Sequence, residues 1–262
     1  MEENAMKAPM IMRRSKRWVL LAPLGVMVLN LAHAAPSSTD CEAWHREAKP
    51  SNLPLPLESL RRLEQRHPEC LGTGMFDVHL ADEYLLSGDA TSATRVVERA
   101  LMKQNNARPN LLHMQVRIDL KLGKTDQAIR WGEAMAMDYP TYTPIQFELA
   151  AIASKRQDWP RALGYARRAY EIEGSARSLL SMAAALHQLD RHEECIAAVR
   201  QALKLEPGRI AKISGLLEGI YSLGVLNRRV EAAELVRQHI AANPNWRANA
   251  AFVEAARALG VV

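Results

Sequence analysis

Small side chains recur through this chain at nearly constant intervals. They are Ala93, Ala128, Ala162, Cys195 and Ala232, spaced by 35, 34, 33 and 37 residues. A period of about 20–50 residues is typical of proteins built from stacked supersecondary units, because one such unit cannot bury its apolar face alone. We therefore expect a row of similar units instead of one closed core.

Each interval contains two segments with the apolar spacing of amphipathic helices. In the first interval the positions that set this spacing are Ala81, Tyr84, Gly88, Ala93, Val97 and Ala100. Gly88 and Gly123 interrupt the spacing as turn residues do, and Pro140, Pro207 and Pro244 follow second segments. Proline ends a helix because it lacks a backbone N–H and restricts the residue before it. With aromatics at only 5% and abundant Ala and Leu, the composition also favours helix.

This frame resembles the tetratricopeptide repeat (TPR) over roughly residues 74–244. The resemblance implies an all-α solenoid of about five helix-turn-helix repeats whose first helices line a concave groove. The aromatic position of the first helix is Tyr84 in the first unit and is taken as Tyr221 in the fifth. In the other units it is Asp119, Ala153 and Leu186. The fifth unit also holds two or three extra residues, which we place near Val225–Arg228.

The two flanks read as caps of the solenoid. Residues 35–73 form an N-terminal capping segment, in which Pro56–Leu63 has helical spacing that stops at His67 and Pro68. Residues 245–262 form a C-terminal cap, in which Trp246–Leu259 is expected to be one amphipathic helix. Terminal units of solenoids need such covers.

Residues 1–34 have the layout of a secretory signal peptide. A basic stretch (residues 12–17) precedes an apolar run (residues 18–31), and Ala32-His33-Ala34 gives a small-x-small cleavage pattern. Met12 is an alternative start. We expect cleavage before Ala35 and a periplasmic location, with an uncleaved inner-membrane anchor as the alternative. Ser-Thr-Asp precedes Cys41 and does not resemble a lipoprotein box, so no lipid anchor is expected.

The chain has three cysteines, at positions 41, 70 and 195. Export places them in an oxidising compartment, where disulfides persist. Cys41 and Cys70 both lie near the start of the mature chain, and we predict that they pair. Cys195 occupies a small repeat position and is expected to be a buried, inert thiol.

Several classes of function find no support in the sequence. Of the net charge of +5, the segment 1–34 carries +3, which leaves +2 and no basic run for nucleic acid. The chain contains no nucleophile elbow, phosphate loop or dinucleotide fingerprint, so neither an enzyme nor a cofactor is expected. Three tryptophans near unit boundaries are expected to pack: Trp131, Trp159 and Trp246.

The stretch His187–Cys195 is the densest group of residues that could bind a metal. Its spacing matches neither a helical two-histidine site nor a paired-cysteine site, so we predict no metal. Placed on the turn of the fourth unit, it should point Cys195 inward and leave His192 and Glu193 in solvent.

A partner is expected in the groove lined by the first helices. The candidate residues are His79, Asp82, His113, Arg117, Lys121, Phe147, Lys155, Arg177 and His187. Basic side chains outnumber acidic ones in this set, which favours an acidic ligand, either an acidic peptide segment or carboxyl terminus or an anionic polysaccharide. The alternative is that these charges only keep the surface soluble.

The sequence therefore predicts a non-enzymatic periplasmic scaffold or adaptor that binds a protein or peptide. Envelope assembly, secretion and polysaccharide export are the processes considered. The alternatives are a membrane-tethered accessory subunit and an enzyme subunit.

Overall fold

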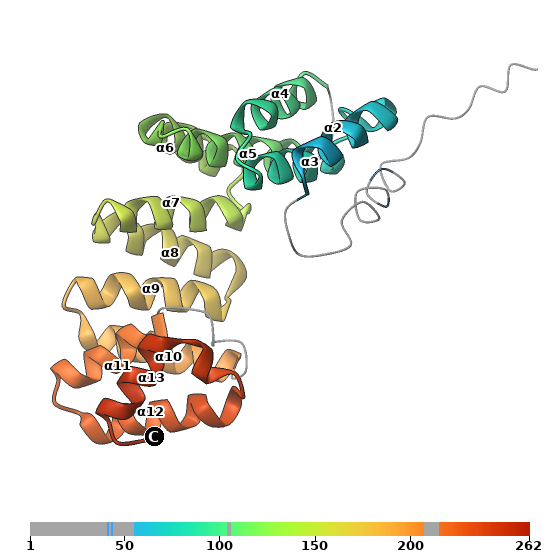
Figure 1. The fold of residues 1–262 in the computed structure, drawn as a ribbon. Coiled ribbons are helices and arrows are strands. Elements are labelled where there is room, and N and C mark those ends of the chain that lie inside the picture. The colour runs from blue at the N-terminus through green and yellow to red at the C-terminus, as the bar shows by residue number, and fades with distance from the viewer. Residues whose placement is uncertain (1–40, 42, 44–54, 104–105, 207–214) are drawn as a thin grey trace, which may run out of the picture. The chain divides into compact units, whose positions relative to one another are not determined.

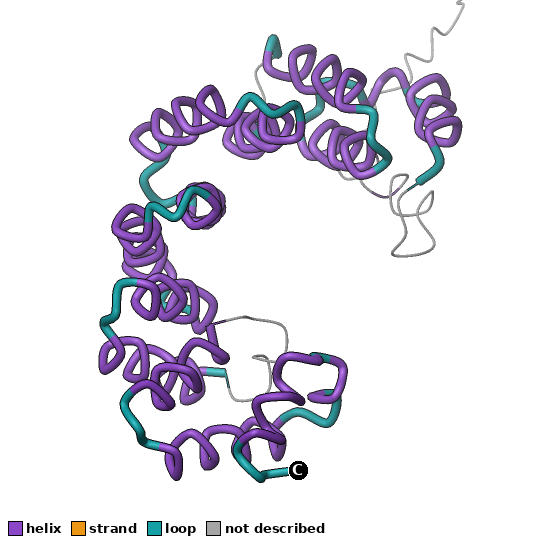
Figure 2. Tube along the Cα trace, turned by 60° about the vertical axis from the view of Figure 1, so that its left-hand side comes forward, coloured by secondary structure: helices purple, strands orange, loops and turns teal. Residues whose placement is uncertain are grey.

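In the computed structural model, Cys41, Ala43 and residues 55–103, 106–206 and 215–262 are described. Within these ranges the chain forms helices joined by short loops and contains no strand, which confirms the all-α prediction (Figures 1 and 2). The predicted signal peptide and residues 44–54 lie outside the described residues. In the described part, no helix has both the length and the apolar character needed to cross a membrane.

Five helix pairs follow one another along the chain, and each pair consists of a helix A and a helix B. The pairs are α3 (Met75–Leu86) with α4 (Ala90–Leu101), α5 (Arg108–Lys121) with α6 (Thr125–Asp138), α7 (Thr143–Lys155) with α8 (Trp159–Glu173), α9 (Ala176–Gln188) with α10 (His192–Leu205), and α11 (Gly215–Val225) with α12 (Arg229–Ala242). Each helix A packs on its own helix B, and each helix B packs on the next helix A. Figure 1 shows α7, α8 and α9 lying side by side in this order.

The turn from helix A to helix B is the same in every unit. One residue adopts a positive φ: Gly88 (87°), Gly123 (76°), Gln157 (59°), Asp190 (56°) or Asn227 (58°). The next residue donates a backbone hydrogen bond to the carbonyl five positions earlier, as Asp89 does to Tyr84 at 2.8 Å and Arg228 to Leu223 at 2.8 Å. This bond satisfies a carbonyl that would otherwise be left unpaired at the end of helix A.

This turn corrects the expected register of the fifth unit. Leu223 accepts the turn hydrogen bond from Arg228, just as Tyr84 accepts it from Asp89. Leu223 therefore occupies the position that Tyr84 has in the first unit. Tyr221 is instead 46% exposed. Leu223 precedes Ala232 by nine residues, just as Tyr84 precedes Ala93. The extra residues therefore lie between Cys195 and Leu223, not near Val225–Arg228.

The small residues of the repeat frame lie where the helices cross. Ala93, Ala128, Ala162, Cys195 and Ala232 are all buried, as the period predicts. Glycine allows still closer approach at Gly215, where a Cβ atom would lie 2.2 Å from the carbonyl oxygen of Leu180. Buried Leu, Ile and Val side chains fill the remaining space between the helices.

The N-terminal cap is closed on itself by a disulfide. Cys41 and Cys70 are bonded with an S–S distance of 2.05 Å, which confirms the predicted pairing, and Cys195 is a buried free thiol. Helix α2 (Leu57–Arg66) and the short 3-10 helix η1 (Pro68–Cys70) follow the expected spacing that ends at His67.

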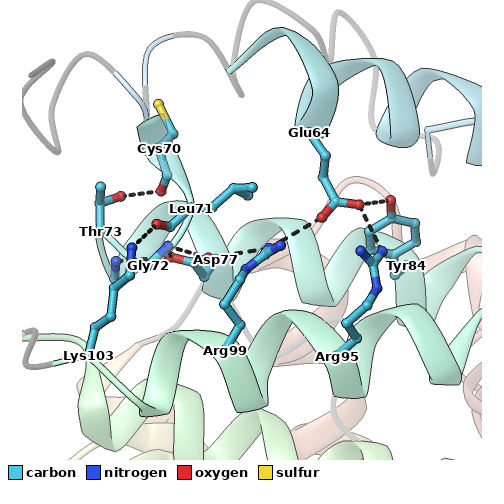
Figure 3. Close-up of polar contacts among 11 residues, drawn as sticks. Glu64, Cys70, Leu71, Gly72, Thr73, Asp77, Tyr84, Arg95, Arg99 and Lys103 are labelled. Atoms are coloured by element: carbon cyan, nitrogen blue, oxygen red, sulfur yellow. Dashed lines mark hydrogen bonds and ion pairs between the residues drawn. The ribbon is translucent and has the colours of Figure 1, made fainter. Parts of the chain in front are cut away.

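Polar contacts join the same cap to α3 and α4. Glu64 of α2 accepts hydrogen bonds from Tyr84 in α3 and from Arg95 and Arg99 in α4 (Figure 3). Asp77 at the start of α3 accepts backbone hydrogen bonds from Gly72 and Gly74. Burial raises the pKa of the Asp77 carboxyl, and these two N–H groups oppose that shift.

The C-terminal cap differs from the single helix predicted for Trp246–Leu259. A 3-10 helix, η3 (Trp246–Ala248), is separated from α13 (Ala250–Ala258) by Asn249. The Asn249 side chain accepts a hydrogen bond from the backbone N–H of Phe252, so it starts a new helix instead of continuing the first one. Phe252 and Trp246 are both buried against the preceding helices.

Candidate functional site

The helix-A residues of the third, fourth and fifth units enclose a groove of about 370 Å³, here called the α7–α9 groove. Phe147 and Ser154 of α7 line one side, and Arg177 and Gln188 of α9 line the other. Glu218 of α11 and Trp159, the first residue of α8, also line it. The volume is within the range of pockets that bind small ligands or single side chains.

Arg177 and Phe147 form the centre of this groove. The guanidinium carbon of Arg177 lies 4.0 Å from the centroid of the Phe147 ring, a cation–π contact between neighbouring units. Both residues were predicted to face a partner, and the structure brings them together. The contact leaves guanidinium N–H groups free to bind an anion from the groove while fixing the direction of the side chain.

Glu218 supplies an acidic group that the sequence analysis missed. Burial raises the pKa of its carboxyl. Its Oε2 atom is buried and has no hydrogen-bond partner among the described residues. A buried carboxyl oxygen without a partner is costly, and a donor group on a ligand could satisfy it.

The helix-A residues of the first three units form ion pairs with one another. Arg117 lies 2.8 Å from Asp82, and Nε2 of His113 lies 3.5 Å from Glu148. The proximity of His113 holds the pKa of Glu148 below its usual value, and the charges of Arg117 and Lys155 act in the same direction. Two of the predicted basic residues are therefore already paired within the protein.

The repeat frame could have identified the pair of Asp82 and Arg117. Asp82 and Arg117 both lie six residues before the positive-φ turn residue of their units, so stacking brings them together. Glu148 and Glu218 both lie nine residues before theirs, at the position that His79 has in the first unit. Equivalent positions in neighbouring repeats meet because each unit packs on the next in the same way.

The other predicted residues do not line the α7–α9 groove. His79 and Lys121 are exposed on α3 and α5. Lys155 follows the groove residue Ser154, and its charge acts on Glu148.

His187 lies in a cluster at the turn of the fourth unit. Nδ1 of His187 is 2.9 Å and Nδ1 of His192 is 3.3 Å from the hydroxyl oxygen of Ser222 in α11. His192 was expected to face solvent, and this prediction is wrong: its side chain is only 13% exposed because α11 packs over it. Ser222 is fully buried, so the cluster joins α9, α10 and α11 and offers no accessible nucleophile.

Glu193, by contrast, is 72% exposed and pairs with Arg228 in the next unit at 2.9 Å. Cys195 points inward and is buried, as predicted. Among the described residues, no three His, Cys, Asp or Glu side chains are placed to hold a metal ion.

Stacked helix pairs joined by identical turns define this chain as a helical-repeat protein. In comparison with solved structures, this arrangement of helices is similar to the fold of tetratricopeptide repeat proteins. The C-terminal part of a TPR repeat-containing protein from Cytophaga hutchinsonii matches with a TM-score of 0.59 and 12% identity, covering 79% of each chain. YrrB, described as a TPR protein with an unusual peptide-binding site, matches with a TM-score of 0.53 and 12% identity, over 76% of this chain and 97% of its own.

MamA from Desulfovibrio magneticus RS-1 matches with a TM-score of 0.52 and 16% identity, over 64% of this chain and 93% of its own. No protein-family model and no curated protein matches the sequence. At these identities the similarity establishes the fold alone.

Proposed function

We propose that this chain is a non-enzymatic periplasmic adaptor that holds an extended segment of a protein partner in the α7–α9 groove. The observation that carries the proposal is the groove itself, formed by helix-A residues of three consecutive units. Similarity to YrrB, a TPR protein with a peptide-binding site, supports a peptide ligand. Envelope assembly, secretion and polysaccharide export are the processes in which we expect such an adaptor.

The groove has residues that can bind the carboxylate, the backbone N–H and the apolar groups of an acidic peptide. Arg177 can bind a side-chain or C-terminal carboxylate, since its position is fixed over Phe147. The unpartnered oxygen of Glu218 can accept a backbone N–H of the same segment. Phe147 and Trp159 add apolar contact area between these two polar points. An acidic peptide therefore suits the groove better than a neutral one, and an anionic polysaccharide is the alternative ligand.

The location in the periplasm is supported by the signal-like residues 1–34 and by the disulfide between Cys41 and Cys70. Fractionation of cells that express the full chain, followed by N-terminal sequencing, tests this part. We expect a soluble periplasmic protein that begins at Ala35. Recovery of the intact N-terminus in the inner-membrane fraction would instead support the tethered alternative.

The groove is tested by affinity capture from periplasmic extract with three forms of the protein. We expect the wild type to retain a partner, and Arg177→Glu to lose it. The matched control is Arg130→Glu, because Arg130 is an exposed residue of a helix B. Equal capture by wild type and the groove variant would exclude the α7–α9 groove as the binding site. A partner released by soluble polysaccharide but not by an acidic peptide would favour the polysaccharide alternative.

A further inference from the structure

A second pocket lies on helices that the α7–α9 groove does not use. It has a volume of about 320 Å³ and is formed by α4 and α6, the helices B of the first two units, with α5 between them. We call it the α4–α6 pocket. Leu101, Leu112 and Met135 give it an apolar lining.

Trp131 lies in this pocket and is 50% exposed, whereas the sequence analysis expected it to pack. A tryptophan that is half in solvent can bury a large additional area when a partner arrives, and tryptophan is enriched at the centres of protein interfaces. Two methionines of this part of the chain are also exposed, Met102 (86%) after α4 and Met137 (76%) in α6. Methionine is common on surfaces that adapt to a bound segment. A half-exposed tryptophan over an apolar lining indicates an interaction site.

The charge of the α4–α6 pocket is one-sided. Glu98 and Asp138 are its two charged lining residues, and no Lys or Arg lines it. Among the described residues, neither carboxylate forms an ion pair, although the chain as a whole has a net charge of +5. Gln115 and Gln127 provide neutral hydrogen-bonding groups beside them. An apolar lining with two free carboxylates is complementary to an apolar side chain flanked by cations.

We infer that the α4–α6 pocket is a second docking site, which binds a short segment of a protein partner that has a large aliphatic side chain next to Lys or Arg. The aliphatic side chain contacts Trp131 and Met135, and the neighbouring cations pair with Glu98 and Asp138. The α7–α9 groove has the opposite preference, because Arg177 favours an anion there. The adaptor can therefore hold two segments of opposite charge at the same time.

The test measures binding of a fluorescein-labelled hexapeptide, Gly-Lys-Leu-Leu-Lys-Gly, to the mature protein by fluorescence anisotropy at low ionic strength. Two matched peptides accompany it, one with both lysines replaced by glutamate and one with both leucines replaced by serine. We expect the first peptide to bind at least tenfold more tightly than either matched peptide. Raising the salt concentration should weaken its binding, since exposed charges are screened.

Variants of the protein locate the site. Trp131→Ala should weaken binding at least tenfold, and so should Glu98→Lys with Asp138→Lys, whose side chains are exposed and can be changed without disturbing the core. The matched controls are Val230→Ala and Glu254→Lys, exposed residues of α12 and α13, which should bind as the wild type does. Phe147→Ala should also leave this peptide bound, which separates the inference from the proposed function of the α7–α9 groove.

Three outcomes would overturn the inference. The first is that the lysine peptide does not bind. The second is that the glutamate peptide binds as tightly as the lysine peptide. The third is that the Trp131 and double-charge variants bind the lysine peptide as tightly as the wild type does. A fourth is a wild-type dimer in sedimentation that Trp131→Ala converts to a monomer, because the pocket would then be an interface between two copies of this chain.

Discussion

The phenolic hydroxyl of Tyr84, at the aromatic position of the first repeat, donates a hydrogen bond to the carboxylate of Glu64 in the capping helix α2. Tyr84 is fully buried, and the same carboxylate pairs with Arg95 and Arg99 (Figure 3). The bond and burial together raise the pKa of Tyr84. The cap is thus attached to the repeat frame by a residue that belongs to the frame itself.

Replacing Tyr84 with Phe should lower the free energy of unfolding by about 1.5–3 kcal/mol, the usual contribution of a buried hydrogen bond to a charged group. The ring remains in place, so the loss reports the hydroxyl alone. Chemical denaturation of the mature protein measures it. Tyr221→Phe is the control, because Tyr221 is 46% exposed, and it should be neutral. An equal effect of the two substitutions would mean that the Glu64 contact does not stabilise the cap.

The disulfide should contribute to the stability of the same cap. It closes a loop with a sequence separation of 29 residues. A loop of this length corresponds to about 3–4 kcal/mol in the chain-entropy model. We expect the mature protein to have the mass of one disulfide, two hydrogens below the fully reduced value, and reduction to lower its thermal midpoint. In Cys41→Ser with Cys70→Ser, the reductant should change nothing, and a shift there would point to Cys195.

Much of the fold could be predicted from the sequence because the repeat depends on small residues at positions where a larger side chain would not fit. Ala93, Ala128 and Cys195 mark helix crossings where larger side chains would keep the backbones apart. The turns were harder to predict. Gly88 and Gly123 indicate a positive φ, but Gln157, Asp190 and Asn227 adopt the same conformation without glycine. Without a glycine to mark the turn at Asn227, the aromatic position of the fifth unit was assigned to Tyr221, whereas Leu223 occupies it.

The candidate site was predicted only in part, because a single helix shows which side chains share a face but not what lies opposite. Phe147 and Arg177 were identified, yet their direct contact depends on the packing of α7 against α9. Arg117 was assigned to an acidic ligand, whereas the stacked repeat pairs it with Asp82. His192 was placed in solvent because its contact with Ser222 comes from another unit.

Two Gly→Ala substitutions should change stability in opposite directions, because Gly215 lies at a helix crossing and Gly164 has open space beside it. Gly215→Ala would place a Cβ atom 2.2 Å from the carbonyl oxygen of Leu180, so the helices must separate. We expect a loss of about 1–3 kcal/mol, as for other overpacked cores. Gly164 in α8 has no heavy atom within 4 Å of the same position, and Gly164→Ala should stabilise the protein by about 0.5–1 kcal/mol. Urea denaturation of both variants measures the difference. Destabilisation of both to the same extent would show that crowding at Leu180 is not the cause.

Two histidines, the half-buried His187 and the buried His239, should make stability depend on pH. Burial lowers the pKa of His187, and the neighbouring His192 lowers it further, while Asp190 acts in the opposite direction. Burial alone lowers the pKa of His239. Between these lowered values and the ordinary value near 6.5, the unfolded chain binds protons that the folded chain does not. The stabilising contribution is therefore complete above about pH 7 and is lost as the pH falls through the folded-state values.

We expect the free energy of unfolding to decrease from pH 7 to pH 5.5, with each histidine contributing at most about 1.4 kcal/mol per pH unit. In His187→Gln the glutamine amide can still reach the hydroxyl of Ser222, so the decrease should become shallower without a loss of the fold. Arg130→Gln is the control, since Arg130 is exposed on α6 and arginine stays charged throughout this pH range, so its replacement should leave the pH profile as in the wild type. Denaturation at half-unit pH steps measures all three proteins. The histidine explanation fails if His187→Gln and wild type have parallel profiles, because the pH dependence would then come from the carboxylates, of which Glu218 lies on the same helix as Ser222.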